Sequence, residues 1–114
     1  MKFIRKDNDL KIIKDNESVD GYFEVFANSV DASLEKHVPI YYIFNDKINV
    51  QVGKTLHPME ENHYIMWICL VNGDDYKFCY LKPGDEPNCV FDYIPGSKIY
   101  AYCNLHSLWV CEVK

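Results

Sequence analysis

The sequence predicts an all-β protein, a seven-stranded immunoglobulin-like antiparallel β-sandwich with a short N-terminal extension. Three observations support this fold class. From residue 40 onward, short runs rich in β-branched and aromatic residues alternate with turn residues every eight to twelve positions. Apolar and polar residues alternate strictly over residues 48–52, which is typical of a half-buried strand. Residues 64–71 are apolar throughout, as expected for an inner strand covered on both faces.

The N-terminal part of the chain has the weakest pattern. Charged and polar segments separate two short apolar runs, residues 10–13 and 22–26, and no stripe with a helical period persists. This pattern favours two or three short strands joined by turns. We therefore divide the chain into an N-terminal extension, residues 1–30, and a main domain, residues 31–114.

The main domain begins with a strand over residues 40–44. Asn45-Asp46 marks a turn, and Asn72-Gly73-Asp74-Asp75 is a strong hairpin signal after the apolar strand. Pro-Gly pairs in residues 83–87 and 95–97 separate the later elements. The remaining predicted strands are residues 76–82, 89–94, 99–103 and 108–113.

Composition narrows the classes of partner. A chain of 114 residues is long enough for one domain with a real core. The net charge of −5 argues against nucleic acid or an anionic membrane as partner, since both favour a basic surface. No apolar run approaches the length of a membrane span, and the N-terminus leads into charged residues rather than a signal segment. We expect a cytoplasmic location.

The five cysteines are odd in number, lie in or beside predicted strands, and include no Cys-x-x-Cys pair. Zinc ribbons and thioredoxin-like motifs are therefore not supported. The pattern favours reduced thiols rather than a disulfide framework. Cys69 and Cys79 are predicted core thiols, and the sequence assigns no role to Cys89 or Cys111, although Cys111 is a rival metal ligand to Cys103.

The most specific local signal for chemistry is Cys103-Asn104-Leu105-His106, at the end of a predicted strand. The other histidines, His37, His57 and His63, also lie beside predicted strand ends, which a sandwich can gather at one rim. Each alone is most simply an exposed loop residue. Together, four imidazoles and a thiolate exceed what a tetrahedral zinc site takes, and they suit iron with one octahedral position open.

Four motifs in order resemble the superoxide reductases, the desulfoferrodoxin and neelaredoxin family. The likeness runs from about Ser29 to Trp109. The motifs are Glu35-Lys36-His37-Val38-Pro39, His57-Pro58-Met59 with His63-Tyr64-Ile65, Leu81-Lys82-Pro83-Gly84-Asp85-Glu86-Pro87, and Cys103-Asn104-Leu105-His106.

The resemblance implies one mononuclear Fe2+/Fe3+ centre per chain. Its equatorial ligands would be His37, His57, His63 and His106, and its axial ligand Cys103. The two catalytic residues would be Glu35 and Lys36. Glu35 would cap the ferric form, and Lys36 would lie near the open face.

The implied reaction is the one-electron reduction of superoxide to hydrogen peroxide. The electrons would come from rubredoxin or a similar external donor. The resemblance also implies a homodimer or larger homo-oligomer.

The chain departs from the longer members of that family at its N-terminus. Those members carry a desulforedoxin-like module in which four cysteines bind a second iron, whereas no cysteine precedes Cys69 here. Residues 1–30 are thus predicted to be a degenerate module without metal. Ser107 and Met66 also differ from the usual family residues, but neither is a proposed ligand.

Two other classes of function fit part of the pattern. A cupredoxin-like electron carrier also combines a β-sandwich, an upstream histidine and a late Cys-x-x-His, but it usually has a methionine a few residues later. A non-catalytic zinc-binding domain would use only four of the five donors.

Overall fold

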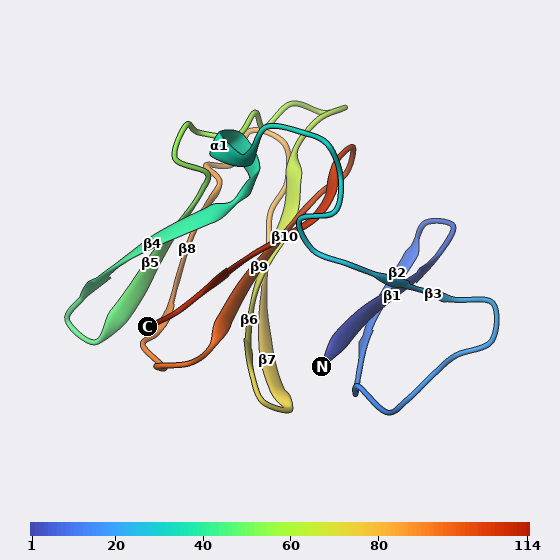
Figure 1. Ribbon diagram of the computed structural model, residues 1–114. Coiled ribbons are helices and arrows are strands. Elements are labelled where there is room, and N and C mark those ends of the chain that lie inside the picture. The colour runs from blue at the N-terminus through green and yellow to red at the C-terminus, as the bar shows by residue number, and fades with distance from the viewer.

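The computed structural model describes residues 1–114 as an almost entirely antiparallel β protein (Figure 1). Two sheets form the main domain. Their strands are β4 (Pro39–Phe44), β5 (Lys47–Val52), β6 (Ile65–Asn72), β7 (Asp75–Tyr80), β8 (Asn88–Asp92), β9 (Lys98–Cys103) and β10 (Ser107–Glu112). One sheet has the order β10-β9-β6-β7 and the other the order β4-β5-β8. This order is immunoglobulin-like, except that β7, the fourth strand of the sandwich, pairs with β6 instead of joining the sheet of β4, β5 and β8. The predicted all-β sandwich is confirmed.

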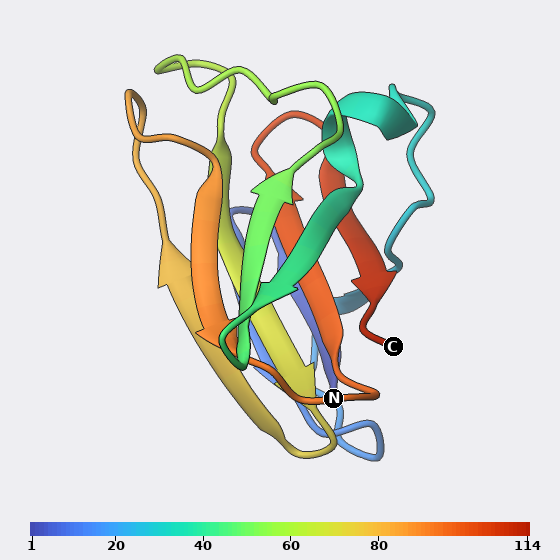
Figure 2. The same cartoon turned by 90° about the vertical axis from the view of Figure 1, so that its left-hand side faces the viewer.

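The core lies between these two sheets, which Figure 2 shows face to face with their strands running in similar directions. Its buried residues come mainly from β5, β6, β8 and β9, where alternate side chains point inward, with one irregularity in β6 between Ile65 and Trp67. Ile48, Ile65, Ile68 and Ile99 are completely buried there. Asn45 and Asp46 both adopt positive φ between β4 and β5, which is the geometry of a tight hairpin turn.

The N-terminal extension forms a third sheet that packs on the outer face of β10-β9-β6-β7 (Figure 1). Its strands are β1 (Lys2–Lys6), β2 (Asp9–Ile13) and β3 (Phe23–Val25), in the order β2-β1-β3. The Phe3 ring is buried, with its centroid 5.3 Å from that of Trp67 and 4.9 Å from that of Tyr100. The apolar strand β6 is therefore covered on both faces, as predicted, and the N-terminal sheet supplies the second cover.

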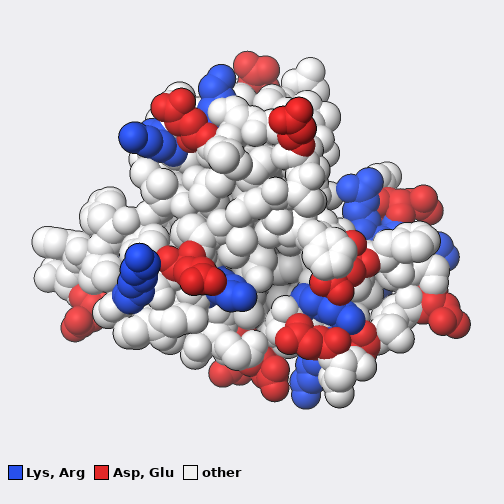
Figure 3. Space-filling model, in the orientation of Figure 1, with Lys and Arg blue, Asp and Glu red and all other residues white.

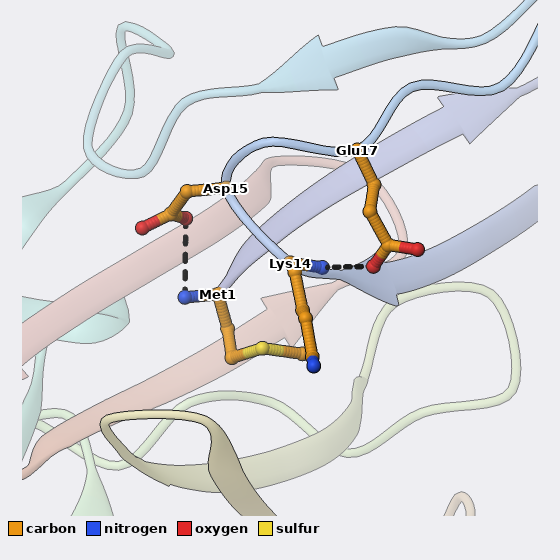
Figure 4. Close-up of polar contacts among 4 residues, drawn as sticks. All are labelled: Met1, Lys14, Asp15 and Glu17. Carbon is orange, nitrogen blue, oxygen red and sulfur yellow. Dashed lines mark hydrogen bonds and ion pairs between the residues drawn. The ribbon is translucent and has the colours of Figure 1, made fainter.

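Polar contacts also attach this sheet to the main domain. The guanidinium of Arg5 donates a hydrogen bond of 3.1 Å to the hydroxyl of Tyr102. Asn28 pairs with Val110 in both directions, accepting from its amide and donating to its carbonyl. Within the sheet, the amino group of Met1 lies 3.1 Å from the carboxylate of Asp15 (Figure 4). The extension is thus a packed layer of the fold.

One short helix, α1 (Leu34–His37), differs from the predicted all-strand arrangement. The side chain of Ser33 caps it by accepting a hydrogen bond from the amide of Lys36. The helix stops at Val38, which is extended because Pro39 follows it. A single turn is too short to leave a periodic signal in the sequence, so only the capping serine could have indicated it.

The prediction that the cysteines are reduced thiols is wrong for two of them. Cys79 on β7 and Cys89 on β8 form a disulfide, with their Cα atoms 6.6 Å apart. Cys69, Cys103 and Cys111 are free. The two bonded residues lie in different sheets, and the sequence gives no sign that the edges of these sheets meet at this point.

Charges of both signs are interspersed on the face shown in Figure 3, which has no continuous basic patch. This distribution agrees with the acidic net charge of −5. No helix in the structure has the length and apolar character needed to cross a membrane.

Truncating Phe3 should destabilise the protein, because its ring fills the interface between the N-terminal sheet and the main domain. We expect Phe3→Ala to lower the free energy of unfolding by about 3–5 kcal/mol in urea titrations followed by tryptophan fluorescence. Phe23→Ala is the matched control, since that side chain is 78% exposed, and it should change stability by less than about 0.5 kcal/mol. Equal effects of the two variants would contradict this packing.

Candidate metal centre

All five predicted donors lie at one end of the sandwich, because antiparallel strands begin and end alternately at the two ends. His37 lies just before β4, and His57 follows β5. His63 lies just before β6, Cys103 ends β9, and His106 lies in the tight turn to β10. Figure 1 shows α1 and these loops together at the top of the molecule. The pairing of Ile65 with Cys103 places the last two donor segments side by side.

The four imidazole rings stand at the corners of a near-square. Neighbouring ring centroids are separated by 4.7 Å (His37–His57), 4.7 Å (His57–His63), 5.2 Å (His63–His106) and 4.8 Å (His37–His106). The diagonal from His37 to His63 is 6.5 Å. Neighbouring rings are steeply inclined to one another, between 72° and 85°. This is the arrangement expected of four nitrogen ligands around one point.

The thiol of Cys103 lies close to this square. Its Sγ is 3.9 Å from Nδ1 of His106. The donor atoms of His37, His63, Cys103 and His106 all lie within 4.8 Å of one another. Because Cys103 is near both His37 and His63, which occupy opposite corners, its sulfur fits a position near the axis of the square. His57 stands outside that tightest group, although its ring neighbours both His37 and His63.

Hydrogen bonds fix which nitrogen of two rings faces the centre. Nδ1 of His37 lies 2.6 Å from the carbonyl oxygen of Ser33, and Nδ1 of His57 lies 2.7 Å from that of Pro58. Each Nδ1–H therefore donates outward, so that Nε2 keeps its lone pair. Nε2 of His37 lies 3.1 Å from Nδ1 of His106, close to the value of about 3.0 Å for two nitrogens at right angles around one ion.

Two of the inward-facing nitrogens have no partner. Nε2 of His57 and Nε2 of His63 are buried without a hydrogen bond in the protein. Buried polar atoms are normally satisfied, so an unpaired pair of this kind requires an explanation. A metal ion that accepts these two lone pairs would supply that explanation, and the donor set fits such an ion.

Burial favours the neutral form of three of the imidazoles. Burial lowers the pKa of His57 to about 4, and it also lowers the pKa of His37 and of His63. A neutral imidazole is the form that binds a metal. Burial raises the pKa of the Cys103 thiol, but hydrogen bonds from the backbone amides of Leu105 and His106 oppose this shift. Those amides would stabilise a thiolate ligand.

A close backbone approach positions the segment that carries His37. A Cβ at Gly53 would lie 2.5 Å from the carbonyl oxygen of Glu35 and 2.6 Å from the carbonyl carbon of Lys36. The amide of Thr55 donates a hydrogen bond of 3.1 Å to the same Glu35 oxygen. Only glycine allows this contact, which brings the residues after β5 against α1.

Asn104 joins the two segments that carry His63 and Cys103, a role that the sequence did not reveal. Its side chain accepts from the amide of Tyr64 at 2.9 Å and donates to the carbonyl of Asn62 at 3.0 Å. Its own amide donates to the carbonyl of Tyr64 at 3.2 Å. The position of Asn104 directly after the cysteine was the only available signal.

Trp109 supports the other side of the cluster. Its ring is fully buried and stacks on His37 with a centroid distance of 4.9 Å. Its indole nitrogen donates to the carbonyl of His106 at 3.0 Å. Trp109 thus fixes two donor residues at once.

The two predicted catalytic residues lie on α1. Glu35 and Lys36 are both exposed, and the Glu35 carboxylate is not part of the donor cluster. The positive charge of Lys36 contributes to lowering the pKa of His37 and of His63. Its field therefore extends to the centre.

A profile of the desulfoferrodoxin family matches residues 29–112. The chain belongs to this family. Desulfoferrodoxin of Syntrophotalea carbinolica is 52% identical, over 75% of this chain and 68% of that protein. Superoxide reductase of Pyrococcus abyssi is 36% identical, over 75% of this chain and 92% of that protein. The predicted family resemblance is confirmed, and these names support the prediction of an oxidoreductase.

Solved structures of family members extend the likeness to the whole chain. The superoxide reductase of Treponema pallidum superimposes with a TM-score of 0.78 and 28% identity, covering 97% of this chain and 98% of that one. The superoxide reductase of Giardia intestinalis, described as 1Fe-SOR, gives a TM-score of 0.62 and 30% identity over 70% of this chain and 98% of that one. The Treponema alignment therefore takes in the N-terminal sheet as well as the desulfoferrodoxin domain.

Asn104→Ala should weaken metal binding, because it releases the His63 segment from the Cys103 segment. We expect the affinity for ferrous iron, measured anaerobically by competition with a chelator, to fall by roughly tenfold. Asn88→Ala is the matched control, since its side chain bonds only to exposed Glu86. If both variants bind iron as tightly as the unaltered protein, Asn104 does not position the site.

Proposed function

We propose that this protein is a superoxide reductase, which converts superoxide to hydrogen peroxide at one mononuclear iron. The iron would be held by His37, His57, His63, His106 and Cys103. The observation that carries the proposal is the near-square of four imidazoles with a thiol close to its axis. The family membership supports it independently.

The donor set favours iron over the alternatives. A structural zinc site takes four ligands, which would leave one of the five donors unused. A cupredoxin-like copper site would leave two of the imidazoles idle, although all four rings adjoin here. Iron would use all five nitrogen and sulfur donors and could still bind a small anion.

When bound, the iron would supply one electron to superoxide, which takes up two protons to become hydrogen peroxide. The protein's residues set the conditions for this transfer. Four neutral imidazoles and one thiolate carry a total charge of −1, so a ferrous centre would be positive and would attract an anion. Lys36 adds a positive field beside it and has ammonium protons to donate to a bound anion.

Other assignments follow from the resemblance. Glu35, exposed beside Lys36, would cap the oxidised centre. The replacement electrons would come from an external carrier such as rubredoxin, and the protein would act in the cytoplasm as a homodimer or larger assembly. Residues 1–30 would be a desulforedoxin-like module that keeps its sheet without cysteines, a reading supported by the alignment to the Treponema structure over 97% of the chain.

Product stoichiometry tests the proposed reaction directly. Iron-loaded, reduced protein mixed with superoxide, with an electron donor in excess, should form one hydrogen peroxide per superoxide consumed and release no dioxygen. Half as much peroxide together with dioxygen would indicate dismutation, and no consumption would refute both activities.

Replacing the thiol tests the assignment of Cys103 as a ligand. Cys103→Ser should abolish the thiolate-to-iron absorption band of the oxidised protein, because serine offers no thiolate. Cys111→Ser, which removes another free cysteine, is the control and should keep the band. A band that persists in Cys103→Ser but disappears in Cys111→Ser would make Cys111 the ligand.

Lys36→Ala should slow the capture of superoxide by roughly two- to threefold at low ionic strength, the size expected of one charge acting through water. The bimolecular rate constant, measured by pulse radiolysis over a range of salt concentrations, should also lose part of its salt dependence. Lys98→Ala, at the start of β9 and so at the other end of the strand from Cys103, is the control. An unchanged rate in Lys36→Ala would rule out steering by that lysine.

A further inference from the structure

The disulfide between Cys79 and Cys89 lies near the metal end of the sandwich but outside the donor cluster. Cys79 is the penultimate residue of β7, and Cys89 is the second residue of β8. β7 and β8 are edge strands of different sheets. The bond is the only disulfide in the chain, so it is the single covalent link between the two sheets apart from the backbone.

The loop that this disulfide closes supports the segment that carries His57 and His63. The amide of Gly84 donates a hydrogen bond of 2.9 Å to the carbonyl of Met59, which lies between those histidines. The buried Pro87 accepts a hydrogen bond of 2.9 Å from the amide of Val52. The carbonyl of Val52 in turn accepts from the amide of His57 at 3.0 Å. Gly84 and Pro87 therefore hold the chain on both sides of His57, at Met59 and at Val52.

The two bonded residues differ in exposure, although both pack against the core between the sheets. Cys89 is buried, whereas Cys79 is partly exposed on an edge strand. Cytosolic reductants keep most thiols reduced, and the disulfides that do form there are commonly transient or redox-sensing. In the predicted cytoplasmic setting, this cysteine pair would exchange between the disulfide and the two free thiols.

We propose that Cys79 and Cys89 form a thiol–disulfide exchange site, whose oxidised state braces the His57–His63 loop and slows loss of the metal. The exchange partner would be a molecule with two thiols, since the complete exchange uses both of them. This inference rests on the proposed metal site, because the brace acts on two of its ligands.

The exchange step balances without any further reagent. One thiolate of the dithiol attacks Sγ of Cys79, forming a mixed disulfide and releasing Cys89 as a thiolate that takes up a proton. The second thiol of the partner then attacks its own mixed-disulfide sulfur and releases Cys79. Two electrons and two protons pass from the dithiol to the protein pair, and the oxidised partner reverses both steps.

Reduction should loosen the loop without unfolding the sandwich, since the backbone hydrogen bonds of both sheets do not involve the sulfurs. Metal-free protein can be equilibrated in mixtures of reduced and oxidised dithiothreitol and its thiols counted by mass after alkylation. The count should rise reversibly from the three free cysteines to all five. Hydrogen exchange of residues 57–63 should become faster in step with that count.

Metal retention provides the second readout. In iron-loaded protein kept free of thiol reagents, the double variant Cys79→Ser/Cys89→Ser should release iron to a chelator roughly tenfold faster than the unaltered protein. Cys111→Ser is the matched control, because this thiol packs against the same core but forms no disulfide. Its release rate should not change.

The outcomes separate this inference from the proposed function. A disulfide that stays oxidised in every mixture, or equal hydrogen exchange of residues 57–63 in both states, would overturn the exchange site. Equal iron release from the unaltered protein and the double variant would overturn the brace while leaving the metal site intact. Failure of the unaltered protein to bind iron would count against the proposed function. The hydrogen-exchange comparison would still decide whether Cys79 and Cys89 form an exchange site that braces the His57–His63 loop.

Discussion

The pairing register between β6 and β9 is the constraint on which the candidate metal centre depends. Ile65 lies opposite Cys103, so His63 and the Cys103–His106 turn leave the sheet at the same point. A shift of one residue would turn Cys103 from the inner face to the outer face. Burial holds the register, because Ile65, Ile68 and Ile99 are fully enclosed between the sheets. Asn104 then fixes the loops beyond the last paired residues, where the sheet no longer does.

Burial prepares the site in two opposed ways. It lowers the pKa of His37, His57 and His63, which keeps their nitrogens free of protons. It also raises the pKa of Cys103, which works against the thiolate. A cation resolves this opposition, because it neutralises a buried thiolate and satisfies the unpaired nitrogens of His57 and His63. The cluster is therefore well matched to a bound cation.

Elements with long patterns or specific motifs could be predicted from the sequence. The strands from residue 40 onward, and the five side chains gathered at one end, could be read from periodicity, turn residues and family motifs. The disulfide could not, because Cys79 and Cys89 meet only through the contact of two sheet edges. The one-turn helix at Leu34–His37 was too short for any periodic signal. The supporting roles of Gly53 and Asn104 arise from backbone approaches and hydrogen bonds that no spacing encodes.

The packing of the N-terminal sheet explains how it can keep its shape without metal-binding cysteines. A small three-stranded sheet has too little core to be stable alone. Here Phe3 is buried against Trp67 and Tyr100, and Arg5 reaches the hydroxyl of Tyr102. The sheet is thus held by the outer face of β6 and β9, and that face is in turn shielded from water. Since Tyr102 immediately precedes Cys103, loss of this cover would expose the strand that ends at the proposed thiolate ligand. The extension therefore contributes to the main domain through packing.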